Sequence, residues 1–173
     1  MIDIHVLTYS GTQEAWLRQC LASLADQPCT VHLVQGDEGN VGSGRARGYL
    51  LGDHDYVGYV DSDDFLLPGA AEACLEGLKK HRAVVTLERW LWGGILDPRL
   101  EPLHHLAVYR REDVMKHVHE LHDHPIHCDQ LLMRRLRPTQ LEYVGYVWRI
   151  HAGQGHRQAT ACQQQAMEAA SCA

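Results

Sequence analysis

Short apolar segments alternate with helix-like segments from residue 2 to residue 87, and this alternation constrains the fold more than any other feature. The apolar segments are rich in the β-branched and aromatic residues of strands and occupy residues 2–8, 31–35, 56–60 and 83–87. Apolar residues recur at helical spacing over residues 13–25. Further helices are expected over residues 41–51, after a glycine-rich loop, and over residues 69–80, where Pro68 suits the first turn. Strands joined through helices pair in parallel and place the helices on both faces of the sheet. The sequence therefore predicts an α/β fold with a Rossmann-like, mostly parallel sheet and helices on both faces.

The second half of the chain alternates less regularly. It predicts strands over residues 106–109 and 143–150, helices over residues 111–120 and 129–137, and an Ala- and Gln-rich terminal helix over residues 158–171. The 173 residues contain no internal repeat and no linker, and their number suits one domain. We therefore expect a compact single domain over residues 1–173.

The composition narrows the choice of partners. The net charge is -6 and the pI is about 6.1, whereas surfaces that grip nucleic-acid phosphates are basic. No apolar run approaches the length of a membrane helix, and the amino-terminal residues lack the basic start and apolar stretch of a signal peptide. The six cysteines form no C-x-x-C pair, which indicates reduced thiols rather than a disulfide framework or a zinc knuckle. These features predict a cytoplasmic protein without a membrane span.

Polar residues follow three of the predicted strands, at the edge where open α/β sheets bind ligands. They are Thr8 and Tyr9, then Asp37, then the D-S-D-D run of residues 61–64. Three carboxylates within four residues repel one another unless a cation or water screens them. Mg²⁺ or Mn²⁺ favours carboxylate oxygens and would bring a diphosphate with it. The run predicts a divalent-cation site; the alternative is a solvated acidic turn in which Asp64 caps the next element.

Several segments, in order along the chain, resemble those of family 2 glycosyltransferases, which have the GT-A fold. Residues 61–70 (DSDDFLLPGA) look like the D-x-D segment of that family. Residues 6–9 and 16–24 are similar to its opening strand and helix, and residues 40–48 (NVGSGRARG) to a degenerate N-x-G-x-x-x-A-R-N-x-G region. Residues 128–136 (CDQLLMRRL) resemble its E-D-x-x-L-x-x-R-L helix, and residues 148–153 (WRIHAG) its late Y-R-x-H-x-G. The resemblance covers residues 2–155 and implies a GT-A fold.

The resemblance also implies roles for the matching residues around the diphosphate. Asp61 would lie against the ribose or the metal of a nucleotide sugar, and Asp63 would bind the metal that bridges the two phosphates. Asp129 matches the position of the catalytic base, for which a plain helix N-cap is the alternative. His151 matches a late histidine that joins the metal or the diphosphate, and its alternative is a surface histidine.

Other matches concern the nucleotide. Thr8, Tyr9 and Asp37 would line the nucleoside pocket. Arg45 lies in the region that helps to hold the nucleotide, with a solvated helix charge or an ion-pair partner as its alternatives. Cys128 stands where the family usually has Glu before the base, which removes a carboxylate that helps to shape the acceptor site.

The function that the resemblance implies is sugar transfer. The chain would be a metal-dependent, inverting glycosyltransferase that uses Mn²⁺ or Mg²⁺ and moves a sugar from a nucleotide-diphosphate sugar, expected to be a UDP-sugar, to an acceptor hydroxyl. Residues 1–90 would form the nucleotide-binding half and residues 91–155 the acceptor and catalytic half. A nucleotidyltransferase of similar fold and a non-catalytic nucleotide-sugar-binding module are the alternatives. The acidic net charge disfavours a nucleic acid as acceptor, although the arginines of residues 134–137 leave it open.

A run of five histidines lies within the predicted acceptor and catalytic half, just before Asp129. The run comprises His117, His119, His122, His124 and His127. Imidazole suits transition metals, so one interpretation is a metal site, although the spacing is not H-E-x-x-H. The alternatives are a polar loop with exposed histidines and a loop in which one or two histidines contact the acceptor.

Overall fold

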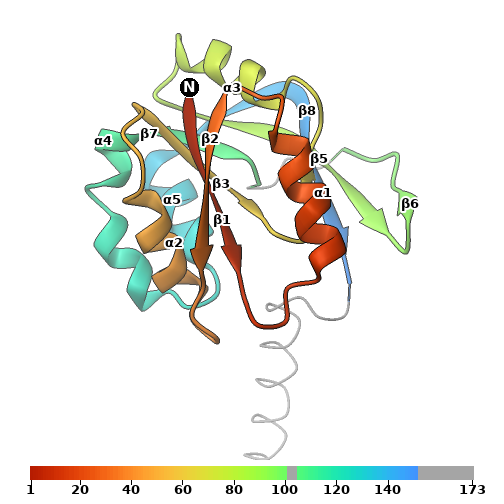
Figure 1. Ribbon diagram of the computed structural model, residues 1–173. Coiled ribbons are helices and arrows are strands. Elements are labelled where there is room, and N and C mark those ends of the chain that lie inside the picture. Colours follow the sequence, from red (N-terminus) through yellow and green to blue (C-terminus); the bar gives the residue numbers. More distant parts are fainter. Residues whose placement is uncertain (101–104, 152–173) are drawn as a thin grey trace, which may run out of the picture.

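One mixed sheet runs through the centre of the computed structural model, which describes residues 1–100 and 105–151 (Figure 1). Its strands lie in the order β2 (Cys29–Gln35), β1 (Ile2–Thr8), β3 (Tyr56–Asp61), β7 (Ala107–Arg110), β5 (Ala83–Trp92), β8 (Thr139–Ile150) and β4 (Phe65–Leu66). The short strand β6 (Ile95–Leu96) pairs with β5 alone. Each of the four strands predicted in the first half of the chain is present.

The first three strands pair in parallel, as the sequence predicts, and the sheet is mixed beyond β3. Strand β1 pairs in parallel with both β2 and β3, and β5 pairs in parallel with β8. Strand β7 lies between β3 and β5 and runs antiparallel to both. Strands β3 and β5 are therefore not adjacent in the sheet. Strand β7, which follows the β5–β6 hairpin in the chain, lies between them.

Helices cover both faces of the sheet, as predicted (Figure 1). Helices α1 (Glu14–Leu24) and α3 (Ala70–Leu78) pack on one face, in a core that includes Ile4, Leu24 and Leu78. The other face carries α2 (Val41–Tyr49), α4 (Arg111–Val114), the 3-10 helix η1 (Val118–Asp123) and α5 (Cys128–Leu136). Its core includes Tyr49 and Leu132. Because side chains alternate along a strand, β1 contributes Ile2, Ile4 and Val6 to the first face and Asp3, His5 and Leu7 to the second.

The second half differs from the sequence prediction in its details. The helix predicted over 111–120 ends at Val114, and η1 occupies part of the predicted histidine-rich loop. The short strands β4 and β6 were not predicted, because two residues carry no readable period. The predicted terminal helix over 158–171 lies outside the described residues. Within the described part of the chain, no helix combines the length and the apolar character that crossing a membrane requires.

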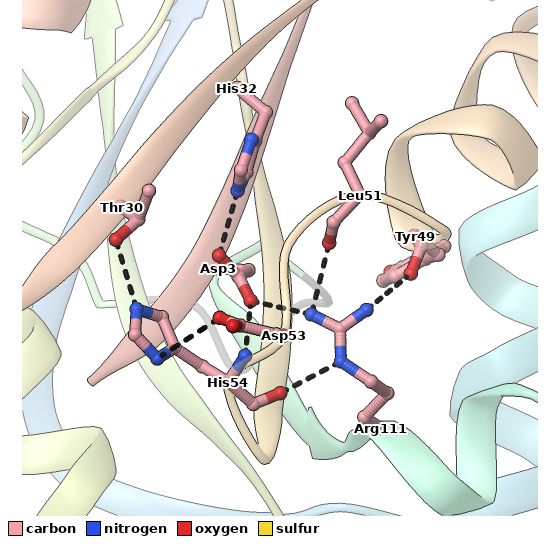
Figure 2. A network of polar contacts seen from close by, with 8 residues as sticks. All are labelled: Asp3, Thr30, His32, Tyr49, Leu51, Asp53, His54 and Arg111. Carbon is pink, nitrogen blue, oxygen red and sulfur yellow. Dashed lines mark hydrogen bonds and ion pairs between the residues drawn. The ribbon is translucent and has the colours of Figure 1, made fainter.

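A polar network joins four segments at the amino ends of the parallel strands (Figure 2). The buried Asp3 carboxylate on β1 contacts His32 Nε2 on β2 at 2.7 Å and accepts the His54 backbone N–H at 2.8 Å. It also pairs with Arg111 Nη2 at 2.5 Å. Burial raises the pKa of Asp3, but these hydrogen bonds and positive charges outweigh burial and lower it. The carboxylate therefore stays charged in the folded protein.

Arg111 completes the network by binding backbone carbonyls. Its Nε donates to the oxygen of His54 at 2.7 Å, Nη1 donates to that of Tyr49 at 3.0 Å, and Nη2 to that of Leu51 at 3.0 Å. The loop between α2 and β3 is thereby fixed to the start of α4 and to β1 (Figure 2). A carboxylate and a guanidinium with this many partners form a structural staple.

Replacing Arg111 by Met should destabilise the fold strongly. The change leaves the Asp3 charge buried without its cation and three carbonyls without their donor, which costs about 3 kcal/mol of unfolding free energy. Urea denaturation measures this loss. The matched control is Arg82→Met, because Arg82 also pairs with carboxylates, those of Glu112 and Asp113, but is exposed. Equal losses in the two variants would contradict the assignment of a buried staple.

Candidate functional site

The carboxyl ends of β1, β2 and β3 meet at one edge of the sheet, as the sequence predicts. In the register of the strands, Leu7 lies opposite Asp61 and Thr8 lies opposite Gln35. The residues that follow β1 and β3 are therefore neighbours in space, although more than fifty positions separate Thr8 from Asp61 in the chain. Ligand sites of open α/β sheets form at such an edge.

Arg45 of α2 is a buried cation that faces this edge. Its side chain is almost fully buried, its guanidinium carbon lies 3.6 Å from the Tyr59 ring centroid, and its Nη2 pairs with Asp61 Oδ1. Burial opposes the charge, but Asp61 more than compensates, so the pKa of Arg45 is raised. The Nε and Nη1 groups of Arg45 are buried and have no hydrogen-bond partner among the described residues. A buried guanidinium with unpaired N–H groups is well suited to receive an anion.

Asp63 and His151, both predicted as metal ligands, are brought together. His151 follows β8, and its Nε2 lies 2.7 Å from Asp63 Oδ2. Its ring also contacts the Trp16 ring of α1, with 4.6 Å between centroids. Burial and the neighbouring Asp61 charge raise the pKa of Asp63. A divalent cation would relieve this repulsion, and a carboxylate oxygen with an imidazole nitrogen is a donor set that fits Mn²⁺.

Asp64 has a structural role. Its carboxylate is fully buried. It accepts a hydrogen bond from the Tyr146 hydroxyl at 2.7 Å and another from the Arg149 backbone N–H at 2.6 Å. The Tyr146 hydroxyl in turn accepts the backbone N–H of Asp61 at 3.2 Å. These contacts join the turn after β3 to β8. The alternative of a solvated turn, with Asp64 capping the next element, is therefore wrong for this residue.

Glu88 and His105 form a buried pair next to Asp61 that the sequence analysis did not predict. His105 Nδ1 lies 2.7 Å from Glu88 Oε2, and both side chains are buried. The other ring nitrogen, Nε2, faces Asp61 Oδ2 at 3.9 Å. Burial lowers the pKa of His105, but Glu88, Asp64 and Asp61 outweigh burial and raise it to about 9. The one signal in the sequence is Glu88 itself, a charged residue within the otherwise largely apolar strand 83–92.

One oxygen or nitrogen from each of Asp61, Asp64 and His105 lies within 4.8 Å of the others, so this group could also hold a cation. Both oxygens of Asp64 already accept hydrogen bonds, however, and the neighbouring carboxylates raise the pKa of His105 to about 9, which favours a protonated ring that cannot bind a metal. Asp63 and His151 are less buried than Asp64 and His105, and their side chains already lie together, with His151 Nε2 at 2.7 Å from Asp63 Oδ2.

Tyr9, predicted in the nucleoside pocket, packs over the end of β2. Its ring lies so close to Gly36 that a Cβ there would be 2.3 Å from a ring carbon, which explains the glycine. Its hydroxyl is buried with no hydrogen-bond partner among the described residues, and burial raises its pKa to about 12. Thr8 donates from Oγ1 to the Val34 carbonyl at 3.4 Å. Asp37 is exposed, and Arg47 binds its carboxylate at 2.7 and 3.1 Å.

Asp129 lies in the first turn of α5, as predicted, and is half-buried. After burial, its charge is the largest influence that raises the pKa of Tyr59, the ring that stacks with Arg45; Asp61 acts in the same direction. The charges of Asp129 in α5 and Asp61 in β3 therefore both act on the Tyr59 hydroxyl. The preceding Cys128 is buried, and burial raises its pKa to about 12, so it does not replace the carboxylate that the family resemblance would place there.

The histidine-rich segment packs against the start of α2. A Cβ on Gly42 would lie 2.0 Å from the Leu121 carbonyl oxygen, and the Val41 N–H donates to the Pro125 carbonyl at 2.7 Å. His117 Nδ1 lies 2.6 Å from Glu120. Among the described residues, two groups of three side chains could hold a metal ion: Asp3 with Asp53 and His54, and Asp61 with Asp64 and His105. Neither group includes a histidine of this run. The contacts indicate a segment that supports the helix carrying Arg45.

The fold of this chain is similar to those of solved structures, although its sequence has no match. As a sequence, the chain matches no protein-family model and no curated protein. As a structure, it is similar to S. aureus TarS 1-349 in complex with UDP-GlcNAc, with a TM-score of 0.63 and 16% identity over 88% of this chain and 59% of that chain. The complex of TarS 1-349 with UDP gives the same TM-score and identity, over 86% and 60%.

The bifunctional IspDF from Campylobacter jejuni is a more distant likeness, with a TM-score of 0.53 and 10% identity over 88% of this chain and 50% of that chain. A longer chain of S. aureus TarS has also been solved, and this chain covers 36% of its length. The chain thus spans less than two thirds of each of these TarS chains. These likenesses confirm the predicted GT-A-like, Rossmann-like fold.

Replacing Tyr146 by Phe should destabilise the site. The change leaves the buried Asp64 oxygen without a donor and the Asp61 N–H without an acceptor, which costs about 1–3 kcal/mol of unfolding free energy. Chemical denaturation measures the loss. The matched control on the same strand is Tyr143→Phe, because the Tyr143 hydroxyl donates to the Pro68 carbonyl at the surface. A loss for Tyr146→Phe no larger than that for Tyr143→Phe would contradict the structural role of Asp64.

Proposed function

We propose that this chain is a metal-dependent, inverting glycosyltransferase that moves a sugar from a nucleotide-diphosphate sugar, a UDP-sugar, to an acceptor hydroxyl. The observation that carries the proposal is the juxtaposition of Arg45, with its unpaired N–H groups, and the carboxylates of Asp61 and Asp63 at the carboxyl edge of the parallel strands. A structure of similar fold has been solved with UDP-GlcNAc, which supports a nucleotide sugar as the donor.

The donor would bind over the first half of the chain, residues 1–90. Thr8 and Tyr9 would line the nucleoside pocket, with Asp37 at its exposed rim. The unpaired N–H groups of Arg45 would bind an anionic part of the nucleotide, and Asp61 would lie against the ribose or the metal. A guanidinium is suited to this task because its N–H groups match phosphate oxygens in geometry and charge.

Asp63 and His151 would hold Mn²⁺ or Mg²⁺. A divalent cation held there would supply positive charge against the negative charge that develops on a departing diphosphate. The fixed charge of Arg45, which pairs with Asp61, would act in the same sense. Both effects lower the energy of the transition state, because the leaving group gains charge as the bond to the sugar breaks.

Asp129 would act as the base within the second half, residues 91–155. Its carboxylate would take the proton of the acceptor hydroxyl while that oxygen attacks the anomeric carbon. One carbon–oxygen bond then forms on the face opposite to the one that breaks, so the configuration inverts. The start of α5 stabilises the ionised carboxylate, because the positive end of the helix dipole lies there.

Nucleotide binding tests the proposed metal ligand. UDP with Mn²⁺ should raise the thermal unfolding midpoint of the native chain, since a ligand at a hundred times its Kd adds about 2.7 kcal/mol of stability. Asp63→Ala should lose the part of the shift that depends on Mn²⁺. The control Asp53→Ala, at a fully exposed aspartate, should keep it. No shift by UDP in the native chain, with or without Mn²⁺, would contradict the proposal.

Turnover tests the proposed base. With UDP-GlcNAc, UDP-glucose and Mn²⁺, the native chain should release UDP, and Asp129→Asn should lower that rate by about 10²–10⁴ while UDP binding stays unchanged. Asp123→Asn, at an exposed aspartate nearby, is the matched control. A full rate in Asp129→Asn would show that another group takes the proton. Binding without release by the native chain would favour the non-catalytic module, and product from a nucleoside triphosphate and a sugar phosphate would favour the nucleotidyltransferase.

A further inference from the structure

The Asp61 carboxylate lies between two buried basic groups. Its Oδ1 pairs with Arg45 Nη2, and its Oδ2 faces His105 Nε2 at 3.9 Å. Arg45 comes from α2 and His105 from the segment before β7, so the two groups approach the carboxylate from different elements. Asp61 engages Arg45 through a single guanidinium nitrogen, and this leaves Nε and Nη1 without a partner in the described part of the chain.

Glu88 and two aromatic rings fix the orientation of the His105 ring. Glu88 on β5 is fully buried, and its Oε2 lies 2.7 Å from His105 Nδ1. The ring stacks on Tyr146, with 4.9 Å between centroids and 11° between planes, and contacts the Trp148 ring at 5.5 Å. A buried carboxylate is costly unless it is paired. Its contact with Nδ1 sets the orientation of the ring, so that Nε2 points to Asp61.

We propose that Glu88 and His105 form a positioning pair that attracts the second oxygen of Asp61 and thereby keeps Asp61 off the buried Nε and Nη1 groups of Arg45, which the donor nucleotide would use. The inference rests on the proposed function, because it names the residues that prepare the same site. A carboxylate and a guanidinium otherwise prefer two parallel hydrogen bonds. With His105 attracting Oδ2, Asp61 stays bound through one nitrogen. Without it, Asp61 would turn onto Arg45 and occupy a donor that the nucleotide needs.

The test compares UDP affinity in His105→Gln and Glu88→Gln with that of the native chain, by calorimetry with Mn²⁺. Removing a group that orients a binding residue typically weakens binding about 10–100-fold, and we expect losses of this size in both variants. The double variant should lose no more than the worse single variant, because the two residues act as one unit. Urea denaturation of each variant shows that it is folded.

The matched control is His32→Gln. His32 contacts the buried Asp3 in the same way, at 2.7 Å, but at the opposite end of β1. This variant should lose stability and keep its UDP affinity within about twofold, so a general loss of stability would be distinguished from a loss of positioning. If His105→Gln does not fold, Glu88→Gln, which nearly preserves the side-chain volume, carries the test. Native UDP affinity in folded Glu88→Gln and His105→Gln would overturn the proposal.

A crystal structure of the His105→Gln or Glu88→Gln variant separates this inference from the proposed function. An Asp61 carboxylate that binds Arg45 through two nitrogens would support the positioning pair, even if the native chain binds no UDP and the proposed function fails. An Asp61 carboxylate in its native position, with one contact to Arg45, would overturn the pair, whatever the native chain binds.

Discussion

The arrangement of the site depends on how three carboxylates within four residues are kept at the end of a buried strand. Like charges in a partly buried turn repel one another, so each needs its own compensation. Asp61 pairs with Arg45 and faces His105, Asp63 contacts His151, and Asp64 is held by hydrogen bonds from β8. These partners come from three parts of the chain, so the turn brings together α2, the segment before β7, and β8 with the residue that follows it.

The two ends of β1 use buried charge differently. At the amino end, Asp3 accepts several hydrogen bonds, and Arg111 donates to Asp3 and to three carbonyls, so this network is internally complete (Figure 2). At the carboxyl end, Arg45 keeps two buried N–H groups without a partner among the described residues. A complete network contributes to stability, whereas an incomplete one is suited to a ligand that supplies the missing acceptors.

The sequence predicts the local elements and the general place of the site well. The apolar period of residues 2–8 and 56–60 sets β1 and β3, and the rule of strand ends places Thr8 and Asp61 at one edge. It fails for Glu88 and His105, since a strand pattern shows that a charge is buried but not which side chain pairs with it. It also fails to predict that β7 enters the sheet antiparallel, because strand order depends on contacts between distant segments.

What the sequence by itself determined is the alternation of strands and helices, and with it the parallel start of the sheet and the acidic turn at its carboxyl edge. These follow from side-chain periods and chain direction, which are local properties. Only the tertiary structure decided which carboxylate is bound by which partner: Asp64 by hydrogen bonds from β8, Asp61 by Arg45 and His105, and Asp37 by Arg47 at the rim. The strength of a charge–charge contact depends on distance and burial, and both are set when separate segments pack together.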